Sequence, residues 1–457
     1  MWTGKLPVKG RFRRNRPFNQ NFVMGCILFC LPGIYLALTG LGAGGGRPSS
    51  QHVASLTNSI LYGVYTFFGW CAGTILNYLK PRYTIAIGAL GYPLYVGSLW
   101  YYDRIGVEAF PLFAGAFLGF TAALLWTSSG FIQFAYAEEK DKAKYITYQW
   151  VLTSAIVMDL LLIVDPKDVV RDDGRHIAIF KEPNLKEELS GVLAVMMDPK
   201  IIILLLPMYV GEVCLALTSS INSYYFNLRT RSLNNLLFQA IMIPAPIALA
   251  WVMDNPRIMS RRNRGLSGVA IVGTITMAST AGLLGWVMRN NIDRSLTSPA
   301  VDWTDSAFAS GFVLYVLSGI VYACFQITVQ WTLSALTNDP VLCARYAGAF
   351  KGTVSLGMCI SFTIDAKSVS FQTQLVVDLV LYAAGLACLV YVIMVYVKDT
   401  NYFLESDVIV PAYAEEKALA QGDVQQTAVE EMRLREAVAE GKTGSVSVAP
   451  ASSDLTL

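Results

Sequence analysis

Four ionisable residues lie inside long apolar stretches of the sequence, where a charged side chain has little access to water. They are Asp159, Glu212, Lys351 and Asp378. A charge in such a stretch is costly, so each of these residues is a candidate for binding a solute or carrying a proton. Glu212, in the stretch PMYVGEVCLAL, is the strongest candidate, because a carboxylate in a low-dielectric cavity can take up and release a proton.

Each of these charges also has a purely structural interpretation. Glu212 could be hydrogen-bonded to a Ser, Thr or Asn of a facing helix. Lys351 follows Arg345 near one end of its apolar stretch, so it could line a cavity or extend its amine to the membrane interface. Asp378 and Asp365 lie near the ends of apolar stretches, where we expect hydrated or paired carboxylates.

Asn222 is a further candidate for contact with a solute. It lies in TSSINSYY (218–225), a polar and aromatic run at the end of an apolar stretch. Such side chains can bind a solute, although they more commonly form hydrogen bonds between neighbouring helices. Both interpretations stay open at this point.

The sequence offers no constellation typical of an enzyme, a metal site or a nucleotide site. His52 and His176 are the only histidines, and neither has ligand-spaced Cys, His or carboxylate neighbours. The run GLGAGGG (40–46) lacks the Lys-Ser/Thr ending of a phosphate-binding loop. Seven of the eight cysteines lie in apolar stretches, and we expect all eight to be unbridged. We therefore predict no enzyme activity, no cofactor, no metal and no nucleic-acid partner.

The candidate residues must be positioned by membrane-spanning helices. The chain has 457 residues, of which 54% are hydrophobic and only 15% are charged. Soluble proteins carry roughly 25% charged residues. The apolar residues form blocks of about the 20 residues needed to cross a bilayer as a helix. The sequence thus predicts an all-α, multi-pass integral membrane protein surrounded by the lipid bilayer.

The apolar blocks predict eleven spans and five regions of the chain. The predicted spans are 21–42, 54–77, 83–101, 108–132, 145–164, 201–223, 233–253, 266–288, 307–334, 346–364 and 373–396. The regions are a basic cytoplasmic N-tail (1–20), an N-terminal helical bundle (21–164), a central polar loop (165–200), a C-terminal six-helix bundle (201–397) and a tail (398–457). The tail is acidic and predicted to be partly helical, then disordered. No cleaved signal peptide is expected.

Loop charges conflict with eleven consecutive crossings. Basic residues in short loops stay on the cytoplasmic side, which places the N-tail inside, together with the loops holding Lys80, Arg82 and Lys140–Lys144. Five crossings would then put the basic central loop outside, and every later loop would also be out of phase. One more crossing between Tyr145 and Asp165 would restore the rule. We therefore expect that one span stands where two belong.

Several stretches resemble those of the Unc-ninety-three-like (ion channel regulatory protein type) membrane proteins, especially fungal members, within the major facilitator superfamily. The stretches are GLGAGGG (40–46), LKPRYTIAIGALGYPLY (79–95), LLWTSSGFIQFAYAEE (124–139), VVRDDG (169–174), YFNLRTRSLNNLL (225–237) and RYAGAFKGTVSLG (345–357). The resemblance covers about residues 18 to 398. It implies a two-bundle fold of twelve spans, built from two six-span halves.

The loop between the second and third predicted spans resembles the superfamily's signature in a degenerate form. Gly73, Asn77, Lys80 and Arg82 occupy its positions, with Asn in place of Asp and Lys in place of the second Gly. In the family these residues clamp helix ends on the cytoplasmic face. The alternative is a basic turn that only follows the charge rule.

The resemblance also locates the gap and leaves three functions open. Similar proteins have a fifth span, an external loop and a sixth span before the stretch resembling VVRDDG, so a deletion, a splice form or a faulty gene model is expected here. The first function is secondary transport of an unknown small solute. The second is regulation or trafficking of another membrane protein without transport. The third is that this form is an inactive truncated isoform.

Overall fold

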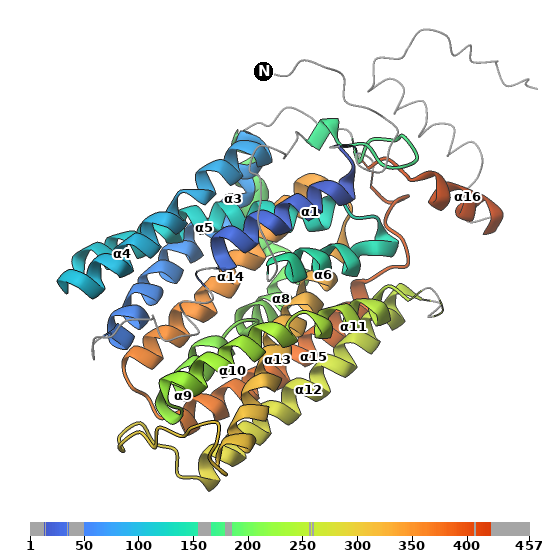
Figure 1. Cartoon of the computed structure of the whole chain (residues 1–457). Helices are drawn as coiled ribbons and strands as arrows, with labels where there is room; N and C mark the ends of the chain where they lie inside the picture. Colours follow the sequence, from blue (N-terminus) through green and yellow to red (C-terminus); the bar gives the residue numbers. More distant parts are fainter. Residues whose placement is uncertain are drawn as a thin grey trace, which may run out of the picture.

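The computed structural model describes residues 13, 15–33, 35, 50–153, 166–178, 185–255, 257, 260–405 and 408–421 (Figure 1). Eight helical segments among these residues are long and apolar enough to cross a membrane. They are His52–Ile105, Ala109–Ala135, Pro199–Tyr225, Leu228–Met253, Arg261–Arg289, Phe308–Leu336, Pro340–Ala366 and Phe371–Tyr396. The prediction of an all-helical multi-pass membrane protein is confirmed. All eight cysteines are free, as predicted.

The first of these segments holds two predicted spans that fold back on each other. Helix α3 (Ser50–Ala89) is sharply kinked at Lys80, whose φ of 64° lies in the left-handed region, directly before Pro81. Helix α4 (Gly91–Ile105) continues the returning arm. The hydroxyl of Tyr95 donates a hydrogen bond to Asn58 Oδ1 at 2.9 Å, so the two arms lie side by side. The reversal has the position predicted for the loop between the second and third spans.

The rest of the N-terminal half surrounds this hairpin. Its elements are α1 (Pro17–Leu28), the π-helical turn η1 (Phe29–Gly33), α5 (Ala109–Ala135), the short turn η2 (Glu139–Asp141) and α6 (Lys142–Thr153). Helices α1 and α6 pack together, and the Nδ2 of Asn21 donates to the backbone oxygen of Tyr145. A Cβ on Gly25 would lie 2.6 Å from the Cβ of Leu152, so glycine is required for this close approach.

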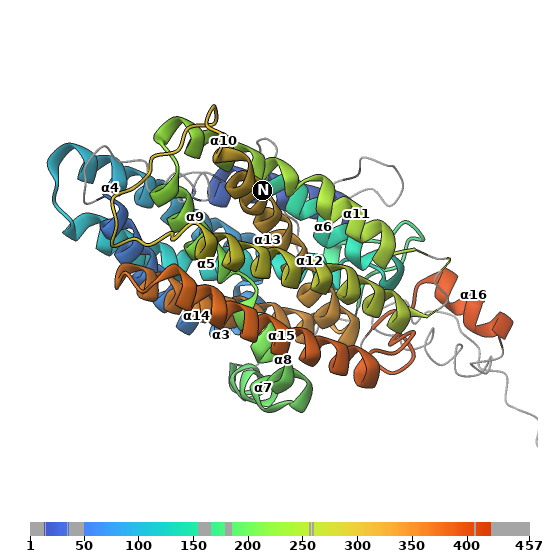
Figure 2. The same ribbon diagram turned by 90° about the horizontal axis from the view of Figure 1, so that it is seen from below.

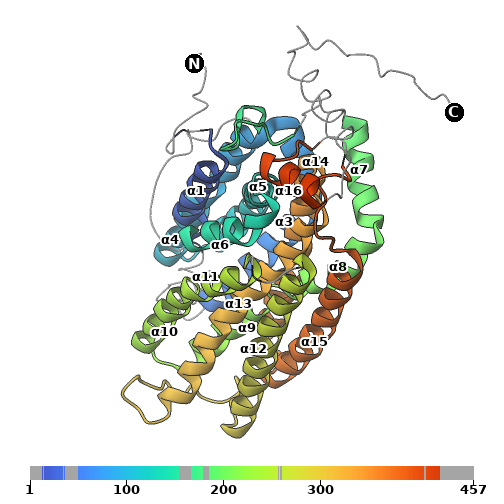
Figure 3. The same ribbon diagram turned by 90° about the vertical axis from the view of Figure 1, so that its right-hand side faces the viewer.

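The C-terminal half contains six predicted spans, two of which are interrupted. Its elements are α8 (Pro199–Val210), α9 (Cys214–Tyr225), α10 (Leu228–Ile241), α11 (Pro244–Met253), α12 (Arg261–Arg289), α13 (Phe308–Leu336), α14 (Pro340–Ala366) and α15 (Phe371–Tyr396). The span over 201–223 is broken between α8 and α9, and the span over 233–253 between α10 and α11. Figure 3 shows α1, α4, α5 and α6 gathered apart from α10, α12, α13 and α15.

The two halves meet where α3 packs along α14. A Cβ on Gly69 would lie 2.6 Å from the Cα of Gly352, and one on Gly73 would lie 2.7 Å from the backbone oxygen of Ala344. Small residues allow backbones to approach this closely within a membrane, where van der Waals packing drives helix association. Near the other end of the contact, Ser59 Oγ and Thr363 Oγ1 share a hydrogen bond of 2.6 Å.

The basic loops lie on one face of the molecule, which we call the inner face. Arg13 and Arg16 of the N-tail form ion pairs with Asp172 of the central loop. Arg171 in turn donates to the backbone oxygen of Ile409 in the C-terminal tail. The charge rule therefore holds for the central loop, which is on the same side as the N-tail.

This placement differs from the predicted fifth crossing at 145–164. Helix α6 begins on the inner face, and the turn η4 (Pro166–Asp168) precedes loop residues that contact the N-tail on that same face. The start of α6 and the loop after residue 165 thus lie on one side. The intervening residues 154–165, including the candidate Asp159, lie outside the described residues. So does the GLGAGGG stretch.

Two further helices lie at the inner face. Helix α7 (Leu185–Met197) lies within the predicted central loop and projects beyond α8 in Figure 2. Helix α16 (Ala412–Gln421) lies in the tail that was predicted to be partly helical. The carboxylate of Glu415 in α16 pairs with Arg175 of the central loop at 2.8 Å.

Candidate functional site

A cavity of about 220 Å³ lies between the two halves and contains two of the predicted site residues, Glu212 and Lys351. Both halves contribute to its walls. The lining includes Phe29, Tyr35, Tyr62, Tyr65, Tyr92, Trp126 and Trp150 from the N-terminal half, and Glu212, Met242, Tyr322, Lys351 and Ser355 from the C-terminal half. The walls are mainly aromatic and aliphatic, with one acidic side chain, one basic side chain and the polar side chains of Gln239 and Ser355.

Glu212 is placed in the cavity by the break between α8 and α9. Residues 211–213 are not helical, so the span is interrupted at the carboxylate itself. Pro207 within α8 lacks a backbone N–H, and Gly211 follows the last helical residue. Irregular backbone at membrane depth is tolerated where it is buried in protein or lines a cavity. The sequence PMYVGEV therefore favours a binding site beside Glu212. The break in the helix is the feature that indicates it.

Glu212 and Lys351 form a loose, buried ion pair. The Nζ of Lys351 is 3.6 Å from Glu212 Oε1, and the two side chains are 6% and 10% exposed respectively. The Tyr322 hydroxyl donates to Glu212 Oε2 at 3.5 Å. Charge-assisted hydrogen bonds are ordinarily about 2.7–2.9 Å long, so both contacts of the carboxylate are weak ones. The hypothesis that Lys351 extends to the membrane interface is wrong, because its amine points to Glu212.

Lys351 also lies against two aromatic rings. Its Nζ is 4.3 Å from the ring centre of Trp126 and 5.1 Å from that of Phe350. A cation within about 6 Å of an aromatic face is stabilised by the ring quadrupole, most strongly by tryptophan. The indole Nε1 of Trp126 is held by the hydroxyl of Tyr92 at 3.1 Å, which fixes the ring under the ammonium.

The aromatic wall of the N-terminal half is ordered by its own hydrogen bonds. Asn58 Oδ1 accepts from both Tyr35 and Tyr95, and the Tyr35 hydroxyl also lies 3.2 Å from that of Tyr62. The Nε1 of Trp150 differs, because it is buried without a hydrogen-bond partner among the described residues.

Two other irregular segments converge on the same cavity. The π-helical turn η1 contains Pro32 and supplies Phe29 to the wall. Met242, in the break between α10 and α11, also lines it, just before Pro244. π-helical turns often occur at functional sites, and broken spans mark the binding sites of many transporters.

The third site candidate, Asn222, does not line this cavity. It is buried in α9, where its Oδ1 accepts a hydrogen bond from Asn234 of α10 at 2.9 Å. This is the interhelical contact that the sequence left open. Asp378 lies in α15 and is also absent from the lining.

Asp365, predicted to be a boundary charge, links several elements at the outer end of α14. Its carboxylate accepts from Ser220 at 2.6 Å and from Ser55 at 3.2 Å, and it pairs with Arg294 at 3.0 Å. Ser55 belongs to α3 and Ser220 to α9. The group therefore joins the two halves at the face opposite the inner one.

The signature-like residues lie at the inner end of the α3–α14 contact. Gly73 packs against the backbone of α14, and Lys80 forms the kink described above. The Nδ2 of Asn77 donates to Glu188 Oε2 at 2.9 Å, and Arg345 pairs with the same oxygen at 3.2 Å. Arg82 is exposed. Glu188 of α7 thus connects the inner ends of both halves, a role that the sequence did not reveal.

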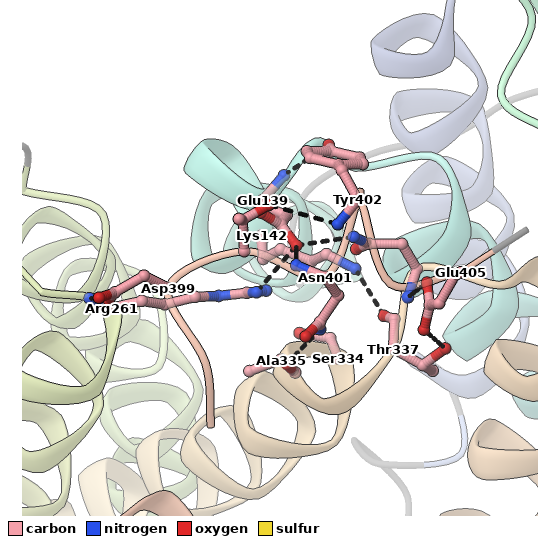
Figure 4. Close-up of polar contacts among 12 residues, drawn as sticks. Glu139, Lys142, Arg261, Ser334, Ala335, Thr337, Asp399, Asn401, Tyr402 and Glu405 are labelled. Atoms are coloured by element: carbon pink, nitrogen blue, oxygen red, sulfur yellow. Dashed lines mark hydrogen bonds and ion pairs between the residues drawn. The ribbon is translucent and has the colours of Figure 1, made fainter. Parts of the chain in front are cut away.

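A second polar cluster closes the inner face and was also missed (Figure 4). The Oε1 of Glu139 accepts from Arg261 at 3.0 Å, from Asn338 at 2.6 Å and from the backbone N–H of Asn401 at 2.9 Å. The hydroxyl of Tyr402 accepts from the backbone N–H of Glu139. These groups come from the loop after α5, the starts of α12 and α14, and the tail. These residues are far apart in the sequence, so the cluster could not be predicted, although Glu139 ends one of the stretches that carry the family resemblance.

Burial alters the acid–base properties of two groups on this face. Burial lowers the pKa of Lys142 to about 8, and its Nζ donates to the backbone oxygen of Phe134 at 2.9 Å. Burial raises the pKa of Asp254, one residue beyond α11, to about 7. Asp254 accepts from the backbone N–H groups of Ala143 and Lys144, so it binds the amino end of α6 to the end of α11.

The cavity can bind a small molecule and exchange a proton, but it has no metal-ligand set. No group of three or more His, Cys, Asp or Glu side chains suited to a metal occurs among the described residues. Among the described lining residues, the chemistry available is that of one carboxylate, one ammonium, several phenols, the amide of Gln239 and the hydroxyl of Ser355.

Comparisons of sequence identify the relatives of this chain. The family model described as ion channel regulatory protein UNC-93 matches residues 50–243. An uncharacterised membrane protein of Schizosaccharomyces pombe is 38% identical, and the match covers 87% of this chain and 87% of that protein. UNC93-like protein 1 of Arabidopsis thaliana is 31% identical over 86% of this chain and 93% of its own length.

The length of the match to the S. pombe protein shows that part of it has no counterpart in this chain. The match to the S. pombe protein extends over 434 positions, whereas 87% of 457 residues is about 398. About 36 positions of the match therefore have no counterpart in this chain.

Solved structures show the same fold at low sequence identity. The Escherichia coli fucose:proton symporter FucP has a TM-score of 0.54 at 12% identity, covering 82% of this chain and 98% of that one. The proton:xylose symporter XylE has a TM-score of 0.52 at 11% identity, with 83% and 93% covered. The chain has the major-facilitator fold.

Proposed function

The chain belongs to the UNC-93 family of multi-pass membrane proteins, and we propose that it is a secondary transporter of a small solute in which Glu212 and Lys351 form the coupling site. The observation that carries this proposal is the loose ion pair, buried between the two halves at a break in a helix. Fold alone does not fix function, so the proposal depends on this site.

The contacts between the halves suit a rocking motion around the cavity. In this fold, access alternates when one bundle moves against the other around a central site. Opening the inner face would separate Gly73 from Ala344 and break the links that Glu188 and Glu139 make. These are hydrogen bonds and backbone contacts at helix ends, which can separate without unfolding a helix.

Uptake by purified protein in liposomes tests the proposal. The liposomes are exposed to a small-molecule cell extract, and the solutes retained inside are identified by mass spectrometry. We expect at least one solute to accumulate with the unmodified chain and with the matched control Glu108→Gln, an exposed carboxylate before α5. Accumulation should be lost with Glu212→Gln. Accumulation no higher than in empty liposomes would reject transport.

A second candidate function, regulation of another membrane protein without transport, is favoured by one observation. Helix α7 exposes Leu189, Leu193 and Met197 at four-residue spacing, so they form an apolar stripe on one face of this inner helix. Co-purification of a membrane protein that survives Glu212→Gln and is lost with Leu193→Glu would support regulation. Loss of uptake with Glu212→Gln alone would support transport.

We also propose that this chain is a shortened form with ten crossings, α6 being the remainder of a fifth span that once led into a sixth. Helix α6 begins on the inner face, the loop after residue 165 contacts the N-tail on that same face, and the match to the S. pombe protein includes about 36 positions without a counterpart in this chain. We expect transcripts across the codons for Gln149 to Lys167 to include a longer form, with higher transport activity than this one. Equal activity of both forms would reject that expectation.

A further inference from the structure

We infer that the solute bound in the cavity is a small organic anion with an apolar body, and that it binds together with one proton. This inference rests on the proposed transport function and names the substrate class of the same site. It is derived from the charges in the cavity, the contacts of each charge and the residues that line its walls.

The charges around Glu212 sum to zero. Lys351 of α14 is the cation beside it, and the titratable groups that face it are Tyr322 of α13, Tyr62 and Tyr65 of α3, and Cys214 on its own helix. The phenols and thiol are neutral, so the cavity holds one negative and one positive charge. Because an uncompensated buried charge is costly, binding should leave the total at zero.

The two members of the pair differ in the contacts that each keeps when the other is neutral. The Lys351 ammonium rests against Trp126 and Phe350, which stabilise a cation whether or not Glu212 is charged. Glu212 has only the two long contacts, to Lys351 and to the Tyr322 hydroxyl, among the described residues. The pair therefore separates most readily by neutralisation of Glu212, which leaves the ammonium charged.

Neutralisation of Glu212 changes the hydrogen-bonding groups that the cavity offers to a solute. A proton from the aqueous phase adds to a Glu212 oxygen, and the Lys351–Glu212 ion pair is lost. The cavity then presents the Lys351 ammonium as a charged donor, and it lacks an anionic acceptor. An anion of the solute replaces Glu212 beside Lys351. One proton and one negative charge enter together, so no net charge is moved.

The walls define the rest of the solute. Tyr62, Tyr65, Tyr92, Trp126 and Trp150 present ring surfaces, which favour an apolar or aromatic body over a polyol with many hydroxyl groups. The combination of one ammonium and ring surfaces fits a small organic monocarboxylate. A cationic solute would instead compete with Lys351 for Glu212 and meet its like charge.

Three probes of one shape test the class: benzoate, benzamide and benzylammonium, which are negative, neutral and positive. Each is titrated into the purified full chain by calorimetry at about pH 5.5 and about pH 7.5, in buffers with different ionisation heats. We expect benzoate to bind at least tenfold more tightly than the other two, with one proton taken up per anion and higher affinity at the lower pH.

Variants separate the roles of the two charges. Glu212→Gln should bind benzoate at the higher pH as well as the unmodified chain does at the lower, without proton uptake. Lys351→Gln should weaken benzoate binding at least tenfold. The exposed residues Glu108 and Lys367 provide the matched controls Glu108→Gln and Lys367→Gln, which should behave like the unmodified chain.

The outcomes that would contradict the inference concern the chemical class of the solute. The liposome assay remains the separate test of transport. Equal binding of benzamide and benzoate, binding of none of the three probes, or preferential binding of benzylammonium would each overturn the anion assignment. Benzoate binding without proton uptake would overturn the coupling to Glu212. Only absence of any accumulated solute in liposomes bears on the transport function itself.

Discussion

At the residue scale, the proposed coupling site consists of one pair of side chains. Glu212 and Lys351 are 139 positions apart in the sequence, and each could be nominated from its own apolar stretch because a charge there is costly. That they face each other could not be predicted, since it depends on how α14 packs against the break between α8 and α9. The same limit explains why Asn222 was nominated although it contacts Asn234.

The pair makes a prediction about stability. Lys351→Met leaves the Glu212 carboxylate buried without its cation, and breaking a buried pair costs about 3–5 kcal/mol. The double variant Lys351→Met with Glu212→Gln leaves no unpaired charge, so we expect it to be more stable than Lys351→Met alone. Thermal unfolding in detergent measures this. A double variant that loses the sum of the two single losses would show that the side chains do not interact.

At the element scale, the close contact of α3 with α14 depends on glycine. A methyl group at Gly69 would overlap the backbone of α14, and overpacking of this kind costs about 1–3 kcal/mol. We therefore expect Gly69→Ala to lower the melting temperature. Gly97→Ala is the matched control, because a Cβ there meets nothing within 4 Å. Equal melting temperatures for the two variants would mean that the helices are further apart than described.

The link between α6 and α11 predicts a dependence on pH. Because the pKa of Asp254 is raised to about 7 from 3.8, the folded chain keeps this proton at pH values where the unfolded chain has lost it. The unfolded state binds fewer protons over that interval, so stability falls as pH rises from about 4 to about 7.

Melting temperatures from about pH 5 to about pH 8 check this dependence. The decline should be smaller in Asp254→Asn than in the unmodified chain, whereas Asp103→Asn, at an exposed position, should leave it unchanged. A steeper decline in Asp254→Asn would contradict the assignment.

Element boundaries show what the sequence could and could not indicate. Apolar block length predicted the spans of α5, α12, α13, α14 and α15 to within a few residues. The breaks beside Glu212 and Met242 were missed, because block length is insensitive to a few non-helical residues inside a span. Pro207, Gly211 and Pro244 were the available signals.

At the scale of the whole molecule, the distribution of basic residues was the more reliable guide. It indicated that the central loop lies on the same side as the N-tail, and the contacts of Arg13 and Arg16 with Asp172 place it beside the N-tail. Counting apolar blocks with a crossing at 145–164 had placed the central loop on the side opposite the N-tail. The clusters around Glu139 and Glu188 could not be predicted, since each joins segments separated by more than a hundred residues.

Labelling of single cysteines tests this topology. Ser190→Cys in α7 and Ser295→Cys in the loop after α12 are exposed, conservative changes, and the native cysteines lie within helices. A membrane-impermeant maleimide should label Ser190→Cys from the side that carries an N-terminal tag and Ser295→Cys from the other side. Labelling of both from one side would require a different arrangement of the two halves.

Solute accumulation driven by a proton gradient tests the central claim most directly. Liposomes holding the full chain are made acidic outside, supplied with the small-molecule extract and compared with liposomes holding Glu212→Gln. We predict that a solute accumulates only with the unmodified chain and only while the gradient lasts. Accumulation that is the same without a gradient, or the same with Glu212→Gln, would contradict the assignment of the Glu212–Lys351 pair as the coupling site.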